Sequence, residues 1–263
     1  MATKKIECFI DCVSPYSYYA FVFLKKNRDL LEKHGVEVEF VPVFLGGINV
    51  GSGNKPPGEL PAKAKYSKFD SKRAQKYFGL SFETPSFFPI LSLRPQRSLI
   101  YAKANYPRPV YETLWLECFR AMWEQHLDLS IPANMLTAIQ RSFTDPKDVE
   151  AVMKSSDIPE IKKQLTANTE HAFKDCGAFG APWSWITTIT STANAPTTTT
   201  TAQAKNFNIR TLRTVITGQI HHVAPQHKAL LAQVYDWVSA KGCAADTGGK
   251  VSYPKTKRPR LLS

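Results

Sequence analysis

The alternation of apolar and polar positions near the start of the chain predicts a β-α-β unit. Residues 5–10 read as a short strand, and residues 36–44 alternate apolar and polar side chains before becoming wholly apolar. Between them, apolar residues at helical spacing predict a helix over residues 15–33, closed by Gly35. This order of elements favours two parallel strands joined by a right-handed crossover.

A long block of helical patterns follows the β-α-β unit. Residues 46–61 are rich in Gly, Pro and Asn and predict a loop, whereas residues 84–95 hold three prolines and exclude a regular helix. A second loop at 177–183 leads into a strand at 184–189. Between the loops the patterns predict six helices, at residues 63–78, 98–105, 110–125, 132–143, 146–153 and 158–176.

The composition changes after residue 184. Of the 22 residues from 184 to 205, 11 are Ser or Thr, which predicts a flexible segment at 190–205. Residues 215–220 and 226–240 are the candidates for a last strand and helix, and residues 241–263 predict a basic, disordered tail. Residues 184–263 carry +8 of the total charge of +12. Because the body of the chain is only mildly basic, we expect no nucleic-acid partner.

Composition excludes several other classes. The chain has 263 residues, 43% of them hydrophobic, so it can bury a core, but no apolar stretch reaches the roughly 18 residues of a membrane span. It begins Met-Ala-Thr-Lys-Lys and runs into a strand pattern, so no secretory signal is expected. Five cysteines without a Cys-x-x-Cys spacing argue against a disulfide scaffold and a zinc site. We interpret His221, His222 and His227 as surface residues and expect no metal.

The candidate chemistry lies in the turn after the first strand. Ser14 is a good N-cap, and Pro15 a good first helical residue. A helix start presents free N–H groups and partial positive charge, so a hydroxyl there can donate a hydrogen bond to a bound thiolate or other anion. An isolated Ser-Pro pair is otherwise only a cap. The Ala181–Pro182 bond, if cis, would add a second wall that presents the Ala181 backbone to a peptide-like ligand.

Three motifs carry a resemblance to a known family. They are FIDCVSPYSYYAF at 9–21, SGNKPPGELPAKAKY at 52–66 and GAFGAPW at 177–183. In order and separation they resemble the kappa class of glutathione transferases and, more widely, the DsbA-like disulfide oxidoreductases, over residues 4–183. The resemblance implies an α/β, thioredoxin-like fold with a large all-helical domain inserted after the first β-α-β unit. The thioredoxin-like domain would comprise residues 1–50 and 177–240, and the insertion residues 60–176.

The resemblance also implies a function. Ser14 matches the catalytic serine that binds the glutathione sulfur and favours its thiolate. Asn54, Lys63 and Ala181 match glutathione-binding positions, and Pro182 matches the cis-proline. The implied activity is conjugation of glutathione, as co-substrate, to a small electrophile, with no metal or other cofactor. Kappa relatives also imply a homodimer and an intracellular location, in the cytoplasm, mitochondrion or peroxisome.

Two alternatives stay open beside the transferase. 2-Hydroxychromene-2-carboxylate isomerase shares the fold, the serine and the use of glutathione. The chain could also be a catalytically impaired protein with an aberrant C-terminus, because the family's Gly-Ser-Asp-Arg motif, which holds the γ-glutamyl group, is absent after residue 184. A disulfide oxidoreductase is disfavoured, since Ser14 and Ser17 replace the two cysteines that thiol–disulfide exchange requires.

Overall fold

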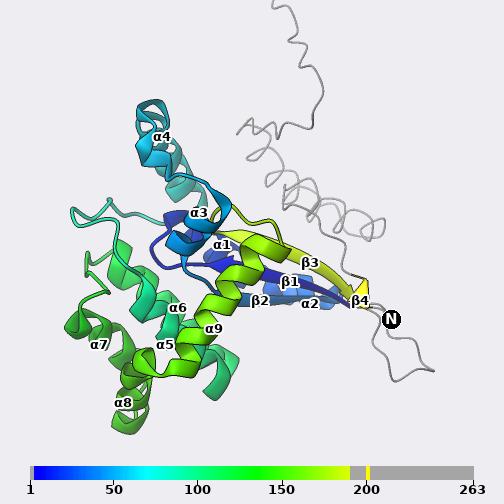
Figure 1. Cartoon of the computed structure of the whole chain (residues 1–263), viewed down its shortest axis with the longest axis vertical. Helices are drawn as coiled ribbons and strands as arrows, with labels where there is room; N and C mark the ends of the chain where they lie inside the picture. The colour runs from blue at the N-terminus through cyan, green and yellow to red at the C-terminus, as the bar shows by residue number, and fades with distance from the viewer. Residues whose placement is uncertain (1–2, 190–199, 202–263) are drawn as a thin grey trace, which may run out of the picture. The chain divides into compact units, whose positions relative to one another are not determined.

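The computed structural model describes residues 3–189 and 200–201 (Figure 1). The features predicted at 215–220, 226–240 and 241–263, and nearly all of 190–205, lie outside the described residues, as do His221, His222, His227 and Cys243. The domain boundaries that depend on this part of the chain stay a prediction.

A small mixed sheet carries the site. Strand β1 (Thr3–Ile10) pairs in parallel with β2 (Val36–Pro42) and antiparallel with β3 (Trp183–Ile189), which pairs in turn with the short β4 (Thr200–Thr201). The order is β2-β1-β3-β4, so β1 lies inside the sheet between β2 and β3 (Figure 1). Ile6, Cys8 and Ile10 of β1 are fully buried, as expected for a central strand. The predicted parallel β-α-β unit is confirmed.

The crossover between β1 and β2 is two helices rather than the single helix predicted. Helix α1 (Pro15–Lys26) and helix α2 (Arg28–Lys33) meet at Asn27, whose side-chain amide donates to the carbonyl of Phe23 at 2.8 Å. Such a local side-chain bond competes with regular helix geometry, which explains the break. Gly35 follows with a φ of 69°, the left-handed conformation that closes a helix.

All six helices predicted for the insertion are present, with shifted ends, and one α-helix was missed. They are α4 (Pro61–Phe78), α5 (Leu93–Asn105), α6 (Arg108–Trp123), α7 (Pro132–Gln140), α8 (Pro146–Lys154) and α9 (Pro159–Glu170). The short 3-10 helix η1 (Pro57–Glu59) precedes them, the 3-10 helix η2 (Ser155–Asp157) lies between α8 and α9, and the π-helix η3 (His171–Asp175) follows α9. Helix α9 lies against β2 (Figure 1). The prediction that residues 84–95 contain no regular helix was wrong for its last residues, because α5 begins at Leu93. Pro95 lies in the first turn of α5, where a missing N–H costs little.

The missed element is α3 (Leu45–Ser52), in a segment predicted as a loop. Its glycines suit a close helix contact. A Cβ atom at Gly51 would lie 2.5 Å from the ring of Phe173 in η3, and Ile48 is fully buried. Packing against η3 therefore overrides the low helix propensity of glycine here.

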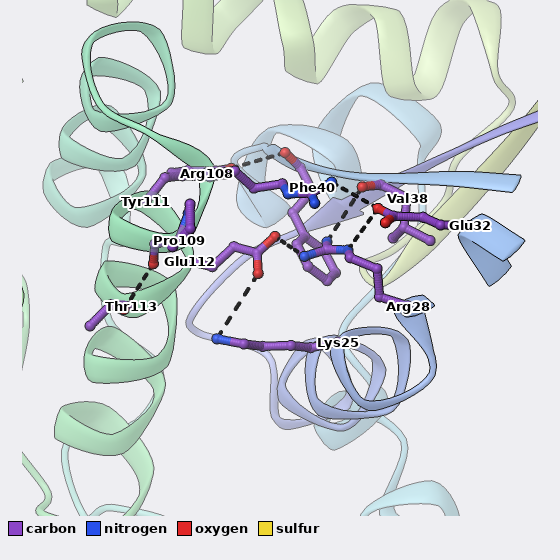
Figure 2. Close-up of polar contacts among 10 residues, drawn as sticks. All are labelled: Lys25, Arg28, Glu32, Val38, Phe40, Arg108, Pro109, Tyr111, Glu112 and Thr113. Carbon is purple, nitrogen blue, oxygen red and sulfur yellow. Dashed lines mark hydrogen bonds and ion pairs between the residues drawn. The ribbon is translucent and has the colours of Figure 1, made fainter. Parts of the chain in front are cut away.

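A buried ion pair fastens the insertion to the crossover and the sheet (Figure 2). Arg28 of α2 pairs with Glu112 of α6, and both residues are more than nine-tenths buried. The Arg28 guanidinium lies 5.3 Å from the centre of the Phe40 ring and donates to the carbonyl of Val38 at 3.4 Å. Tyr111 of α6 donates its hydroxyl hydrogen bond to the Phe40 carbonyl at 2.9 Å. We call Arg28, Glu112 and these partners the clamp.

Candidate functional site

The turn between β1 and α1 holds Ser14 as the sequence predicts. Ser14 is the N-cap of α1 in extended backbone geometry, and its Oγ accepts a hydrogen bond from the backbone N–H of Ser17 at 3.3 Å. The backbone N–H of Ser14 donates to the carbonyl of Asp11 at 3.0 Å, which closes the turn. The hydroxyl is thereby held at the positive end of α1, where an anion is favoured.

The loop before β3 meets this turn. The Ala181–Pro182 bond is cis, and the Ser14 hydroxyl donates a hydrogen bond to the carbonyl of Ala181 at 2.9 Å. The antiparallel pairing of β1 with β3 explains the contact, since Phe9, near the end of β1, pairs with Trp183 at the start of β3. Three of the sequence-predicted residues, Ser14, Ala181 and Pro182, are therefore brought together.

The second motif reaches the same loop through Asn54. Its side-chain amide donates to the carbonyl of Phe179 at 2.6 Å, two residues before Ala181. Asn54 follows Gly53, whose φ of 74° ends α3 in the left-handed conformation. Lys63, the third residue of α4, is exposed and forms no ion pair within the described ranges. The structure thus joins Asn54 to the site, whereas no contact among the described residues brings Lys63 to it.

Sequence reasoning missed Asp11, the first residue of the turn from Asp11 to Ser14, which we call the serine turn. Asp11 is fully buried, and its carboxylate accepts four hydrogen bonds. The donors are the backbone N–H groups of Val13 (3.1 Å) and Leu45 (2.8 Å), the hydroxyl of Ser92 (2.7 Å) and the side-chain amide of Gln96 (2.9 Å). Burial raises the pKa of Asp11 above its ordinary value, and the hydrogen bonds oppose that effect. The position of an acidic residue directly after a buried strand was the one feature of the sequence that could have indicated Asp11 as a site residue.

The cysteines of the described region are free and buried: Cys8, Cys12, Cys118 and Cys176. Burial raises the pKa of Cys8 and of Cys176 to about 12 and the pKa of Cys12 well above its ordinary value. At neutral pH these side chains are thiols, which are poor nucleophiles. Cys12, in the serine turn, is therefore a buried neutral thiol that contributes to packing.

The described residues form neither a metal-binding cluster nor a membrane-spanning helix. No group of three or more His, Cys, Asp or Glu side chains within 3–189 and 200–201 is placed to hold a metal ion. Over the same ranges, no helix combines the length and the apolar character needed to cross a membrane.

This fold and this turn define a class of protein. Residues 5–197 match the family model of the DSBA-like thioredoxin domain, and the chain belongs to that family. Among curated proteins it is similar to glutathione S-transferase kappa 1 of Homo sapiens, with 28% identity over 184 residues that cover 68% of this chain and 79% of the relative. It is similar also to glutathione S-transferase kappa 2 of Caenorhabditis elegans, with 28% identity over 192 residues that cover 70% and 81%.

A solved structure supports the fold. 2-Hydroxychromene-2-carboxylate isomerase superposes with a TM-score of 0.54 at 19% identity, covering 69% of this chain and 84% of that protein. The α/β, thioredoxin-like fold with a helical insertion is confirmed, and so is the resemblance to kappa-class glutathione transferases that the three motifs carry.

Proposed function

We propose that the protein is a kappa-like glutathione transferase that conjugates the glutathione thiolate to small electrophiles. The observation that carries the proposal is the Ser14 hydroxyl at the start of α1, 2.9 Å from the carbonyl of Ala181 beside a cis-proline. The kappa-class names of the curated relatives supply the thiol substrate. The reaction needs neither a metal nor a further cofactor.

The chemistry follows from the surroundings of Ser14. The Ser14 hydroxyl has a single hydrogen, which it donates to the Ala181 carbonyl, while its oxygen accepts from the N–H of Ser17. A glutathione sulfur placed at this helix start would compete for that hydrogen. The bond and the helix charge favour the ionised sulfur, lowering the thiol pKa from roughly 8.5. The thiol proton leaves to solvent, the thiolate sulfur bonds to the electrophilic atom, and the displaced group departs.

The rest of the site suits an anionic peptide. The backbone of Ala181 offers edge hydrogen bonds to the cysteinyl part of glutathione, and Pro182 fixes that edge. Asn54 orders the loop through its bond to the Phe179 carbonyl, while Lys63 can pair with a carboxylate. In this proposal the partners are glutathione, a small electrophile and a second copy of the chain in a homodimer.

The first test is direct. The purified full chain is mixed with glutathione and an aromatic chloride, and conjugate formation is followed by absorbance. The same preparation is assayed for glutathione-dependent isomerisation of 2-hydroxychromene-2-carboxylate, because a solved isomerase shares this fold. Conjugation without isomerisation supports the transferase, and the reverse supports the isomerase. Glutathione binding with neither reaction would indicate the impaired protein.

A second test concerns binding. Saturating glutathione should raise the melting temperature, because a ligand at about 100 times its dissociation constant stabilises the folded state by about 2.7 kcal/mol. The double variant Asn54→Ala, Lys63→Ala should lose most of this rise, since it removes the loop contact and the Lys63 ammonium. Lys163→Ala, which removes an exposed lysine of α9, serves as the control and should keep it. A rise of equal size in all three proteins would refute the assignment of both residues.

A further inference from the structure

The carboxylate of Asp11 joins three helix starts at one point. Its Oδ1 accepts from the N–H of Val13, in the turn before α1, and from the Gln96 amide in the first turn of α5. Its Oδ2 accepts from the N–H of Leu45, the first residue of α3, and from the hydroxyl of Ser92, the N-cap of α5. The serine turn is thereby tied to two elements that follow β2 in the chain.

The same residue is bonded to the serine turn through its backbone. The Asp11 carbonyl accepts from the N–H of Ser14 at 3.0 Å, and the Asp11 N–H donates to Ser17 Oγ at 3.3 Å. The N–H of Ser17 then donates to Ser14 Oγ. These hydrogen bonds connect Asp11 to Ser14 Oγ, the oxygen atom that faces the Ala181 carbonyl. The orientation of the Ser14 hydroxyl therefore depends on where the Asp11 side chain is anchored.

We propose that Asp11 is a positioning residue for Ser14: its carboxylate anchors the serine turn to the starts of α3 and α5 and so fixes the direction of the Ser14 hydroxyl. This inference rests on the proposed function, which makes that hydroxyl the donor to the glutathione sulfur. Asp11 itself does not touch the reacting atoms.

A carboxylate suits this point better than an amide, because all four of its partners are donors. An Asn at position 11 would direct an NH2 group at two of them. On the Oδ1 side, Gln96 can turn its Oε1, which is buried and without a hydrogen-bond partner, to accept, but the Val13 N–H loses its acceptor. On the Oδ2 side, Ser92 can rotate its hydroxyl, but the Leu45 N–H cannot reorient. Either way a backbone group of a helix start is released.

Among the described residues, no cation pairs with the carboxylate of Asp11, and the groups that face it are neutral. Ser92 and Gln96 come from α5 and are neutral, α3 contributes the Leu45 N–H, and the adjacent turn contributes Val13 and the Cys12 thiol. Burial, the charge of Asp11 and the nearby Cys118 raise the pKa of Cys12, so this thiol stays neutral as well. Hydrogen-bond geometry is therefore what the site gains from Asp11, at the cost of a buried charge.

The test compares Asp11→Asn with Glu112→Gln, which alters another buried carboxylate, in the clamp. Steady-state kinetics should show kcat reduced roughly 10- to 100-fold in Asp11→Asn, with KM for glutathione changed by less than about threefold, because small misplacements of a reacting group have effects of this size. When the thiolate absorbance of bound glutathione is titrated against pH, it should appear about one pH unit higher in Asp11→Asn than in the wild type. Glu112→Gln should lower the melting temperature and leave kcat and the thiolate titration as in the wild type.

A milder variant and a ligand-free measurement complete the test. Ser92→Ala removes one donor to Asp11 and should shift kcat and the titration in the same direction by a smaller factor. Hydrogen exchange without glutathione should speed up over residues 11–17 in Asp11→Asn and not in Glu112→Gln.

Three results would overturn the inference: wild-type kinetics in Asp11→Asn, unchanged exchange in the turn, or thiolate formation at lower pH, which would mean that the carboxylate acts as a repelling charge. A wild-type protein that fails to bind glutathione defeats the proposed function instead. The exchange measurement still decides whether Asp11 anchors the turn in that case.

Discussion

Ser14 accepts a hydrogen bond as the N-cap of α1 and donates one through its hydroxyl. Substitutions of Ser14 and Ser17 test which of the two serines supports turnover. We expect Ser14→Ala to lower the turnover of a model electrophile by at least roughly tenfold with the fold kept, because a hydrogen bond to a charged group is worth about 1.5–3 kcal/mol and about 1.4 kcal/mol corresponds to tenfold in rate. Ser17→Ala keeps the backbone N–H that donates to Ser14 Oγ and loses the acceptor for the Asp11 N–H. It should cost about 1 kcal/mol of stability and little turnover.

Steady-state kinetics and urea unfolding of the two variants check this prediction. We expect both variants to lose about 1 kcal/mol of stability, because Ser14→Ala also removes the N-cap acceptor for the Ser17 N–H, but only Ser14→Ala to lose rate. Equal turnover in the two variants would show that the Ser14 hydroxyl is not the donor to the sulfur.

At the scale of elements, the clamp decides how firmly α6 holds the crossover and β2. Glu112 pairs with Arg28, and the Lys25 ammonium lies 4.0 Å from its second oxygen. We expect Glu112→Ala to lower the free energy of unfolding by about 3–5 kcal/mol, because the buried Arg28 loses its main partner. The double variant Arg28→Met, Glu112→Leu should be close to the wild type, since apolar residues of similar volume avoid the cost of burying two charges.

Urea denaturation of the single and double variants measures these differences. Glu150→Ala is the matched control, because its ion pair with Lys154 is exposed on α8 and should contribute little to stability. A double variant as unstable as Glu112→Ala would show that the charges are needed for packing in their own right.

Across the described part of the molecule, Glu39 links the sheet to the insertion. Burial alone would raise the pKa of Glu39, but hydrogen bonds and charge from Lys103 of α5 and Lys5 of β1 outweigh it, so its pKa lies below the ordinary value of 4.5. The folded state therefore releases this proton more readily than the unfolded state. The resulting stability is present above pH 4.5 and is lost as the pH falls through the lower folded-state pKa.

We expect Glu39→Gln to remove this part of the acid sensitivity. The difference in unfolding free energy between wild type and variant should be up to about 1 kcal/mol at neutral pH and should shrink below pH 4.5. Urea unfolding across this pH range measures it. A difference that stays constant with pH would mean that Glu39 contributes by packing alone.

The sequence by itself determined the local features of this protein. The β-α-β unit, the six helices of the insertion and the cap at Ser14 follow from periodicity and capping, which act over a few residues. The three motifs were enough to indicate the family. Local patterns gave wrong predictions in two places. At Asn27 a side-chain hydrogen bond interrupts a helical pattern, and in α3 the glycines predicted a loop although packing against η3 stabilises a helix.

Only the tertiary structure decided which distant groups meet. The Ser14 hydroxyl contacts Ala181, 167 residues away, because β1 and β3 pair antiparallel. The donors to Asp11 from Leu45, Ser92 and Gln96 are 34, 81 and 85 residues away. No periodicity or cap encodes such contacts, since they arise when the helices of the insertion pack on the sheet. The residues of the serine turn follow from the sequence alone, whereas the orientation of the Ser14 hydroxyl depends on how the insertion packs on the sheet.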